Sequence, residues 1–353
     1  MKTVRLGKSE LIVSRVGMGG IPIQRPSFDE AVRVVRRALD LGVTLIDTSR
    51  GYGESEERIG KGIAGRRNQV TIATKGGWRS RDMAAEHIDL SLTRLDTDWI
   101  DLWQFHGVNT LEGFEGLFGP DGAMEAAQAA LRAGKIRHIG LSSHSPDVAK
   151  RAVTSSHFET VQFPFNFVGR ESGEELAALA REHDVGFIAM KPFGGGILRK
   201  ADLVIRYLLQ FDHVVPIPGV EAEGEIEEIV GIIEQDSHDL TGEDWDEIEA
   251  IRERVGTRFC RRCLYCMPCP HGVQTSALMS LPVLWELWPP EIVFSEETPL
   301  GVYTKRNVDS VENCIQCGEC EKKCPYELPI REMIVEHAEM YPVSYTHLTL
   351  PTN

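Results

Sequence analysis

The sequence has no cysteine in its first 259 residues, and all eight of its cysteines lie between residues 260 and 324. Cysteines grouped in this way indicate a metal site rather than a scattered set of disulfides, and they suit a reducing compartment. The chain also lacks an apolar run of about 18 residues, the length that a membrane-spanning helix needs. Its start, Met1 to Gly7, lacks the apolar core of a signal peptide. We therefore expect a cytoplasmic protein with no membrane partner.

Positive charge is in deficit as well. Lysine and arginine together number 38, against 53 aspartates and glutamates, so the net charge is −15. A chain this acidic is a poor partner for nucleic acid or for an anionic membrane surface. With 353 residues, 42% of them hydrophobic, it can bury one large core and carry a second, smaller domain.

Short apolar segments alternate with helical patterns through most of the chain. Residues 3–15 predict a β-hairpin. The strands predicted after it lie near 16–19, 43–46, 70–74, 99–105, 136–141, 160–163, 186–190 and 214–217. The predicted helices lie near 28–41, 54–64, 84–95, 122–133, 146–155, 171–183, 198–210 and 223–235, with a long loop at 109–122.

Eight strands that alternate with eight helices are typical of a (β/α)8 TIM barrel, an α/β fold. A doubly wound sheet is the competing architecture. It should carry a glycine-rich fingerprint after its first strand, and Gly17-Met18-Gly19-Gly20 does not match G-x-G-x-x-G. A further helix at 241–255 ends the predicted barrel domain, which we place at residues 1–255.

Four chemically different side chains follow three of the predicted strands. Asp47, Lys75 and His106 each stand at a strand end, and Tyr52 lies on the loop after Asp47. Active sites of TIM barrels lie at the C-terminal ends of the strands. A phenol titrates near pH 10, and a neighbouring ammonium would lower that pKa toward the range of a useful acid. Each residue alone is more often structural, but the four in this register indicate a catalytic site.

In these four residues and their order the chain resembles the aldo-keto reductases, whose tetrad is Asp, Tyr, Lys and His. The resemblance implies that Tyr52 protonates a substrate carbonyl while a nicotinamide delivers hydride to its carbon. Lys75 would stabilise the phenolate, and Asp47 would hold Lys75 charged and in place. His106 would donate a hydrogen bond to the carbonyl oxygen as charge develops there. The implied substrate is a small carbonyl compound or the corresponding alcohol.

Later strands resemble the family's cofactor-binding motifs. Ser142 and Gln162 match residues that hold the nicotinamide carboxamide, although Ser143 stands where the family usually has Asn. Met190 replaces a commonly aromatic residue that stacks on the nicotinamide, and a polarizable thioether could pack there. The other positions that match the family's cofactor motifs are Pro192, Gly194, Pro218, Gly219 and Glu228.

Acidic residues follow Gly219. Family members that use the 2′-phosphorylated cofactor often have a basic residue here, whereas this chain has Glu221, Glu223 and Glu225. Like charges near a 2′-phosphate are costly, so we expect NAD(H) to be favoured over NADP(H). The alternative interpretation is a solvated helix start that the helix dipole favours.

The cysteines form two runs with regular spacing. The first is Cys260, Cys263, Cys266 and Cys269, and the second is Cys314, Cys317, Cys320 and Cys324. The second has the spacing of bacterial ferredoxins, in which the fourth cysteine ligates the other cluster. We therefore expect two [4Fe-4S] clusters with crossed ligands, in which each fourth cysteine joins the other run. A four-cysteine zinc site is the rival, but it would leave the intervening thiols idle.

Residues 256–341 thus predict a small, mainly helical ferredoxin-like domain, with an irregular stretch after Pro289-Pro290. Over nearly its full length the chain resembles a branch of the aldo-keto reductases that carries such a module. Residues 343–353 look like a non-native tail. The favoured function is a nicotinamide-dependent oxidoreductase that interconverts a carbonyl and an alcohol. The alternatives are a regulatory barrel and a redox-sensing or electron-transfer protein, and the clusters could serve a redox partner protein.

Overall fold

We describe the protein from a computed structural model, which covers residues 1–77, 79–256, 258–260, 265–287 and 289–341. The chain divides into two compact units, Met1–Arg252 and the remainder from Glu253 onward. Cys263 and the expected tail at 343–353 lie outside the described residues. Within the described ranges, no helix is both long enough and apolar enough to cross a membrane.

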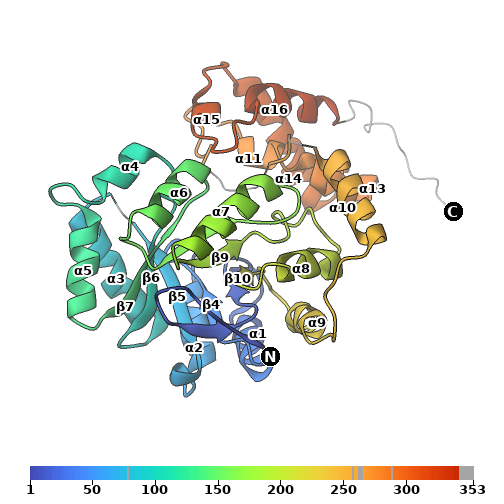
Figure 1. The fold of residues 1–353 in the computed structure, drawn as a ribbon. Coiled ribbons are helices and arrows are strands. Elements are labelled where there is room, and N and C mark those ends of the chain that lie inside the picture. Colours follow the sequence, from blue (N-terminus) through green and yellow to red (C-terminus); the bar gives the residue numbers. More distant parts are fainter. Residues whose placement is uncertain (78, 257, 261–264, 288, 342–353) are drawn as a thin grey trace. The chain divides into compact units, whose positions relative to one another are not determined.

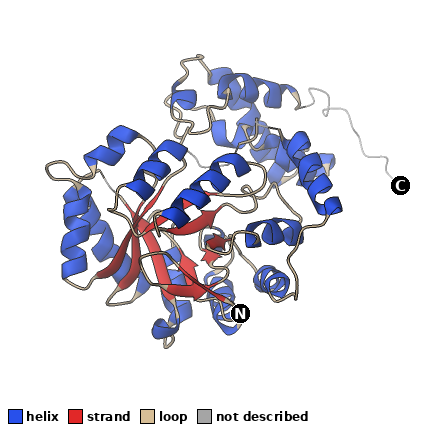
Figure 2. Ribbon diagram, in the orientation of Figure 1, coloured by secondary structure: helices blue, strands red, loops and turns tan. Residues whose placement is uncertain are grey.

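The first unit is built on eight parallel strands, each paired with its neighbours in chain order (Figures 1 and 2). They are β3 (Met18–Gly19), β4 (Leu45–Asp47), β5 (Thr71–Gly76), β6 (Ile100–Phe105), β7 (Ile136–Ser142), β8 (Thr160–Pro164), β9 (Gly186–Met190) and β10 (Val214–Ile217). The two edges of this sheet also meet. Gly17 N donates to Pro216 O at 2.9 Å, and Gly19 N donates to Pro218 O at 2.7 Å. The sheet therefore closes into a barrel, which confirms the predicted (β/α)8 barrel.

Helices follow the strands around the barrel. They are α1 (Phe28–Asp40), α2 (Ser55–Ile63), α3 (Arg81–Leu95), α5 (Ala123–Arg132), α6 (Pro146–Thr154), α7 (Arg170–Glu182), α8 (Ala201–Leu209), α9 (Glu223–Ile233) and α10 (Gly242–Val255). The predicted hairpin is confirmed as β1 (Thr3–Arg5) paired antiparallel with β2 (Ile12–Ser14). Local sequence explains the helix starts. At α1, Ser27 and Glu30 form a reciprocal capping box that satisfies backbone N–H groups at the helix start.

One helix of the barrel was not predicted. The segment 109–122, expected to be a loop, contains α4 (Leu111–Gly116). The helix is too short to show a hydrophobic period. Its signal is instead local, because the Thr110 hydroxyl accepts a hydrogen bond from Gly113 N at 3.0 Å.

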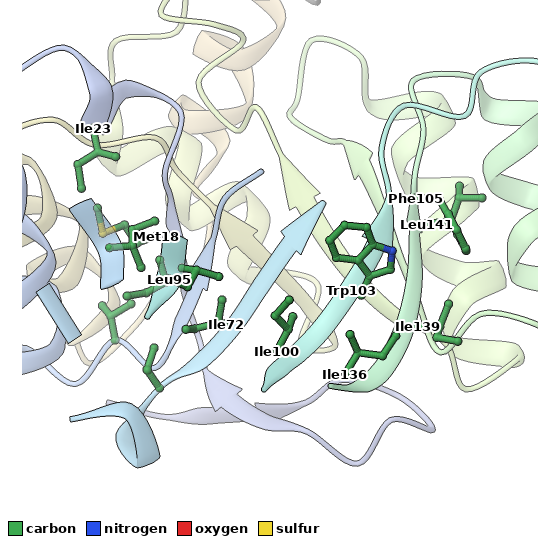
Figure 3. Close-up of a cluster of buried hydrophobic side chains, with 14 of the residues drawn as sticks. Met18, Ile23, Ile72, Leu95, Ile100, Trp103, Phe105, Ile136, Ile139 and Leu141 are labelled. Atoms are coloured by element: carbon green, nitrogen blue, oxygen red, sulfur yellow. The ribbon is translucent and has the colours of Figure 1, made fainter. Parts of the chain in front are cut away.

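Strand residues fill two layers of core. Outward-facing side chains such as Ile72, Ile100 and Trp103 pack between the sheet and the helices (Figure 3). Inward-facing side chains, Ala73 and Leu102 among them, fill the barrel interior. Both faces of each strand are covered, so the strands are almost continuously apolar. Polar residues that interrupt this pattern at the C-terminal strand ends therefore stand out as site residues.

The second unit is mainly helical. It contains α11 (Thr275–Leu278), α12 (Leu281–Leu287), α13 (Pro290–Val293), α14 (Pro299–Asp309), α15 (Glu319–Lys322) and α16 (Ile330–Glu339). The expectation of an irregular stretch after Pro289-Pro290 was wrong. Pro290 and Pro299 each begin a helix, at a position where the missing N–H has no intrahelical partner to lose.

Arg15, between β2 and β3, connects this segment to the end of α8 and to the residues that follow it. Its guanidinium donates to Phe211 O at 2.8 Å, to Leu209 O at 3.3 Å and to Val214 O. The side chain is buried, and burial lowers the pKa of Arg15 to about 10. Among the described residues it has no carboxylate partner, so its role is to satisfy these carbonyls.

We predict that Arg15→Met lowers the free energy of unfolding by about 1–3 kcal/mol, because buried carbonyls lose their donor. Urea unfolding of the full chain measures the change. Arg5→Met is the control, since Arg5 is a partly exposed hairpin residue that pairs with Asp184, and such pairs contribute little. Equal losses in the two variants would contradict the assignment.

Candidate active site

A buried ion pair lies at the C-terminal end of the barrel strands. Lys75 Nζ donates to the two carboxylate oxygens of Asp47 at 2.6 and 2.7 Å, and to Thr48 O at 2.7 Å. Burial lowers the pKa of Lys75 and raises that of Asp47, and the attraction between the two groups opposes both shifts. An ammonium has three N–H donors, so these contacts fix Lys75 in one position.

Two glutamines frame this pair. Gln162 Nε2 lies 3.3 Å from Asp47 Oδ1, and Gln104 Nε2 donates to Gln162 Oε1 at 2.7 Å. Gln162 was expected to bind the cofactor, and the structure shows that it also supports the carboxylate. Gln104 was not predicted. Its signal is the single amide of strand β6, in which Asp101 is the other buried polar residue, and its Nε2 lies 3.4 Å from Asp47 Oδ2.

Tyr52 and His106 complete the group. Their rings meet edge to face with centroids 5.6 Å apart, and Lys75 Nζ lies 5.3 Å from the Tyr52 ring centroid. Burial, reinforced by the charge of Lys75, lowers the pKa of His106 to about 3. The imidazole is therefore neutral at physiological pH and can donate one N–H. The structure thus brings together all four residues that the sequence predicted at this site.

A cavity of about 390 Å³ opens beside Asp47 and Tyr52. Five of the residues predicted to bind the cofactor line it: Gln162, Met190, Pro192, Gly219 and Glu228. Three others are not among its lining residues. Ser142 Oγ accepts from Gly107 N at 3.0 Å, Pro218 O accepts from Gly19 N, and Gly194 lies in the turn after β9.

Residues that the sequence analysis missed also line this cavity. They come from the segment after β3 and from the loop after β9, and they are Gly19, Gly20, Ile21, Pro22, Arg25, Phe193, Gly195, Gly196 and Arg199. Pairing of β3 with β10 brings the first of these segments against Gly219. Because about two hundred residues separate the two strands, a local sequence pattern could not reveal this contact.

The acidic end of the cavity is internally paired. Glu221 accepts from Arg25 Nη1 at 3.0 Å, and Glu223 lies 3.5 Å from Arg33. Glu225 Oε2 accepts from the backbone N of Glu221 at 2.7 Å and from that of Ala222 at 3.2 Å. The Glu225 carboxylate therefore already occupies the N-terminal end of α9, where an anion would otherwise bind.

Cysteines of both runs meet in the second unit. Cys266, Cys269, Cys314, Cys317 and Cys320 line one small cavity of about 20 Å³. Cys260 and Cys324 pack against the apolar core of the unit. The seven described cysteines are not in disulfides. Within the described ranges, no three Cys, His, Asp or Glu side chains converge as ligands of a single metal ion would.

Comparison with known proteins places these features in a family. The model of the aldo/keto reductase family matches residues 15–203, more than half of the chain. An uncharacterized oxidoreductase of Bacillus subtilis is 33% identical over 217 residues, which cover 58% of this chain and 68% of that protein. An aldo-keto reductase of the same species is 34% identical over 206 residues, which cover 52% of this chain and 60% of that protein.

Solved structures agree with the sequence relatives. The holo form of an aldo-keto reductase from Bacillus halodurans superposes with a TM-score of 0.62 at 27% identity, covering 71% of this chain and 96% of that one. An aldo-keto reductase from Klebsiella pneumoniae in complex with NADPH shares the fold, with a TM-score of 0.61 at 22% identity over 71% of this chain and 95% of that one. The chain therefore belongs to the aldo/keto reductase family and is an oxidoreductase.

Proposed function

We propose that the protein interconverts a small aldehyde or ketone and the corresponding alcohol, with a nicotinamide dinucleotide as the redox cofactor. The observation that carries this proposal is the buried Lys75–Asp47 pair, with Tyr52 and His106 beside it. A large cavity starts at the same place. A structural ion pair would not need a phenol that lines a cavity with a neutral imidazole packed against it.

Each residue has a separate task in the proposed reaction. A bound nicotinamide supplies the hydride for the carbonyl carbon. Tyr52 donates its hydroxyl proton to the carbonyl oxygen, and the Lys75 ammonium stabilises the phenolate that remains. The neutral His106 donates an N–H to the same oxygen as negative charge develops there. Asp47 keeps the ammonium charged and in place, and in the reverse direction the phenolate takes the proton of the alcohol.

The cavity walls fit a dinucleotide. Gly195, Gly196 and Gly219 line it without side chains, so a ligand can approach the backbone there. Met190 lies on the same wall, and Glu228 lies toward the acidic end with Glu221 and Glu225. Gly194 and Pro218 are chain neighbours of lining residues, and Ser142 pairs with Gln162 across adjacent strands, so these three would contribute by positioning the wall.

We propose NAD(H) rather than NADP(H) as the preferred cofactor. The acidic residues are partly neutralised, because Arg25 pairs with Glu221 and Arg199 also lines the cavity. The position of Glu225 weighs more strongly against a 2′-phosphate. Its carboxylate accepts the backbone N–H groups before α9, so a 2′-phosphate would have to displace a negative group to bind there.

We further propose that residues 256–341, within the second unit, are a ferredoxin-like domain that holds two [4Fe-4S] clusters. A cluster needs thiolates that surround a space rather than meet at one atom. The cysteine-lined cavity supports this, because Cys269 lies on its wall with Cys314, Cys317 and Cys320, which is the crossed ligand set expected for one cluster. Cys266 lines the same cavity. Cys260, Cys263, Cys266 and Cys324 would hold the other cluster.

A second function, exchange of single electrons with a partner protein, is favoured by one observation. Cys317 is exposed on the surface of its unit. A cluster held there would lie near solvent, where a redox partner could reach it. Clusters and free thiols both persist in a reducing compartment, so we propose a cytoplasmic location.

We predict that Tyr52→Phe lowers kcat for carbonyl reduction by about 10²–10⁴, as loss of a general acid does, while nicotinamide binding is retained. Steady-state kinetics and fluorescence titration with NADH measure the two properties. Tyr303→Phe, an exposed tyrosine of α14, is the control. A Tyr52→Phe enzyme with more than half of the wild-type kcat would remove Tyr52 from the mechanism.

Glu221→Arg should raise kcat/KM with NADPH relative to NADH, because it places a cation at the end of the cavity that a 2′-phosphate would approach. The matched control is Glu223→Arg, which makes the same charge change at a residue that does not line this cavity. A wild-type preference for NADPH, or equal shifts in the two variants, would show that Glu221 does not set the choice.

Anaerobically purified protein should contain about eight iron atoms per chain, as two [4Fe-4S] clusters require. Cys317→Ser should remove about half of this iron, because it removes one ligand of one cluster only. Metal analysis and the visible absorbance measure both. Zinc in place of iron would refute the cluster assignment, and complete loss of iron in Cys317→Ser would refute two independent sites.

A further inference from the structure

Ser49 is a buried hydroxyl that contacts the site histidine. Its Oγ lies 2.9 Å from His106 Nδ1 and 3.1 Å from Lys75 O, and it accepts a hydrogen bond from Gly51 N at 3.1 Å. The side chain is 1% exposed. Ser49 does not line the large cavity, so its contacts act through His106 rather than on a ligand.

A neutral imidazole carries one proton, on Nδ1 or on Nε2, and the hydrogen bond at one nitrogen decides the state of the other. Burial keeps His106 neutral, so the tautomer is the remaining variable. In the Nε2–H form the ring can donate to a carbonyl oxygen. In the Nδ1–H form it presents a lone pair to that oxygen and repels it.

Ser49 has a single hydroxyl proton for two acceptors. Lys75 O already accepts from Arg50 N at 2.9 Å, so it is satisfied without the serine. His106 Nδ1 is the nearer of the two acceptors, at 2.9 Å rather than 3.1 Å. For Nε2, the described part of the chain provides no hydrogen-bond partner, so this nitrogen is available to a substrate.

We propose that Ser49 is a positioning residue that donates to His106 Nδ1 and thereby fixes the imidazole as its Nε2–H tautomer. The effect of this tautomer on catalysis rests on the proposed function, in which His106 donates to the carbonyl oxygen. The assignment of the tautomer is independent of that function, because it can be measured without any substrate.

Nitrogen-15 NMR of the full-length protein, labelled at histidine, tests the tautomer directly. The His106 signals are assigned by their absence in His106→Gln. We expect a protonated Nε2 and an unprotonated, hydrogen-bonded Nδ1 at neutral pH. A protonated Nδ1 would overturn the proposal, because the serine would then be the acceptor. This measurement needs no Ser49 variant, so it decides the matter even if Ser49→Ala does not fold.

The Ser49→Ala variant tests the effect of the serine on the tautomer and on catalysis. In this variant the His106 signals should show a mixture of tautomers. Its kcat should fall about fivefold, the rate equivalent of one ordinary hydrogen bond, with a smaller change in KM. Ser49→Thr keeps the hydroxyl and should restore both. Ser9→Ala, which removes another buried serine hydroxyl, is the control. An unchanged tautomer in Ser49→Ala would overturn the proposal, whereas a wild type that reduces no carbonyl would overturn the proposed function alone.

Discussion

The ion pair between Lys75 and Asp47 is the interaction on which the rest of the site depends. Both side chains are buried, and removing one partner of such a pair typically costs about 3–5 kcal/mol because the other charge is left uncompensated. The protein therefore surrounds the pair with polar groups, namely Thr48 O, Gln104 and Gln162. This polar layer interrupts the apolar interior of the barrel just where the strands end. Lys75 Nζ lies 5.3 Å from the Tyr52 ring centroid, and its charge helps to lower the pKa of His106, so Lys75 acts on both residues.

Closure of the barrel adds the second requirement, a cavity next to the pair. The contact between β3 and β10 brings Gly19 and Pro22 against Gly219, and a side chain at 219 would lie 2.7 Å from the Pro22 ring. Glycine at this position therefore serves the packing of the barrel as well as the cavity wall. The first and last strands of the barrel both contribute to the proposed cofactor end, whereas the residues proposed to transfer the proton come from β4, β5 and β6 and the segments that follow them.

Much of this arrangement follows from the sequence, because it depends on local order. Strand ends in a parallel barrel face one way, so Asp47, Lys75 and His106 could be assigned to one site from their positions after apolar runs. Contacts between distant segments could not be predicted. The pairing of Arg25 with Glu221 joins residues 196 positions apart, and it changes the charge that an acidic run presents. The role of Glu225 depends on a carboxylate folding back onto its own helix start, which composition alone does not reveal. Short helices that begin with proline, such as α13, could not be predicted from hydrophobic periodicity either, because they complete barely one turn.

Together, the two proposals join a barrel that moves a hydride to a cysteine-rich unit that moves single electrons. The central claim is that the chemistry on the substrate is hydride transfer at the Tyr52 site. Carbonyl reduction with NADH deuterated on the transferred face of C4, followed by mass spectrometry of the alcohol, tests it directly. The account predicts a single deuterium on the carbinol carbon, with none taken up there when the solvent is D2O and the cofactor is unlabelled. An alcohol whose carbon carries solvent deuterium instead would contradict it, since the reducing equivalents would then have travelled as electrons and protons.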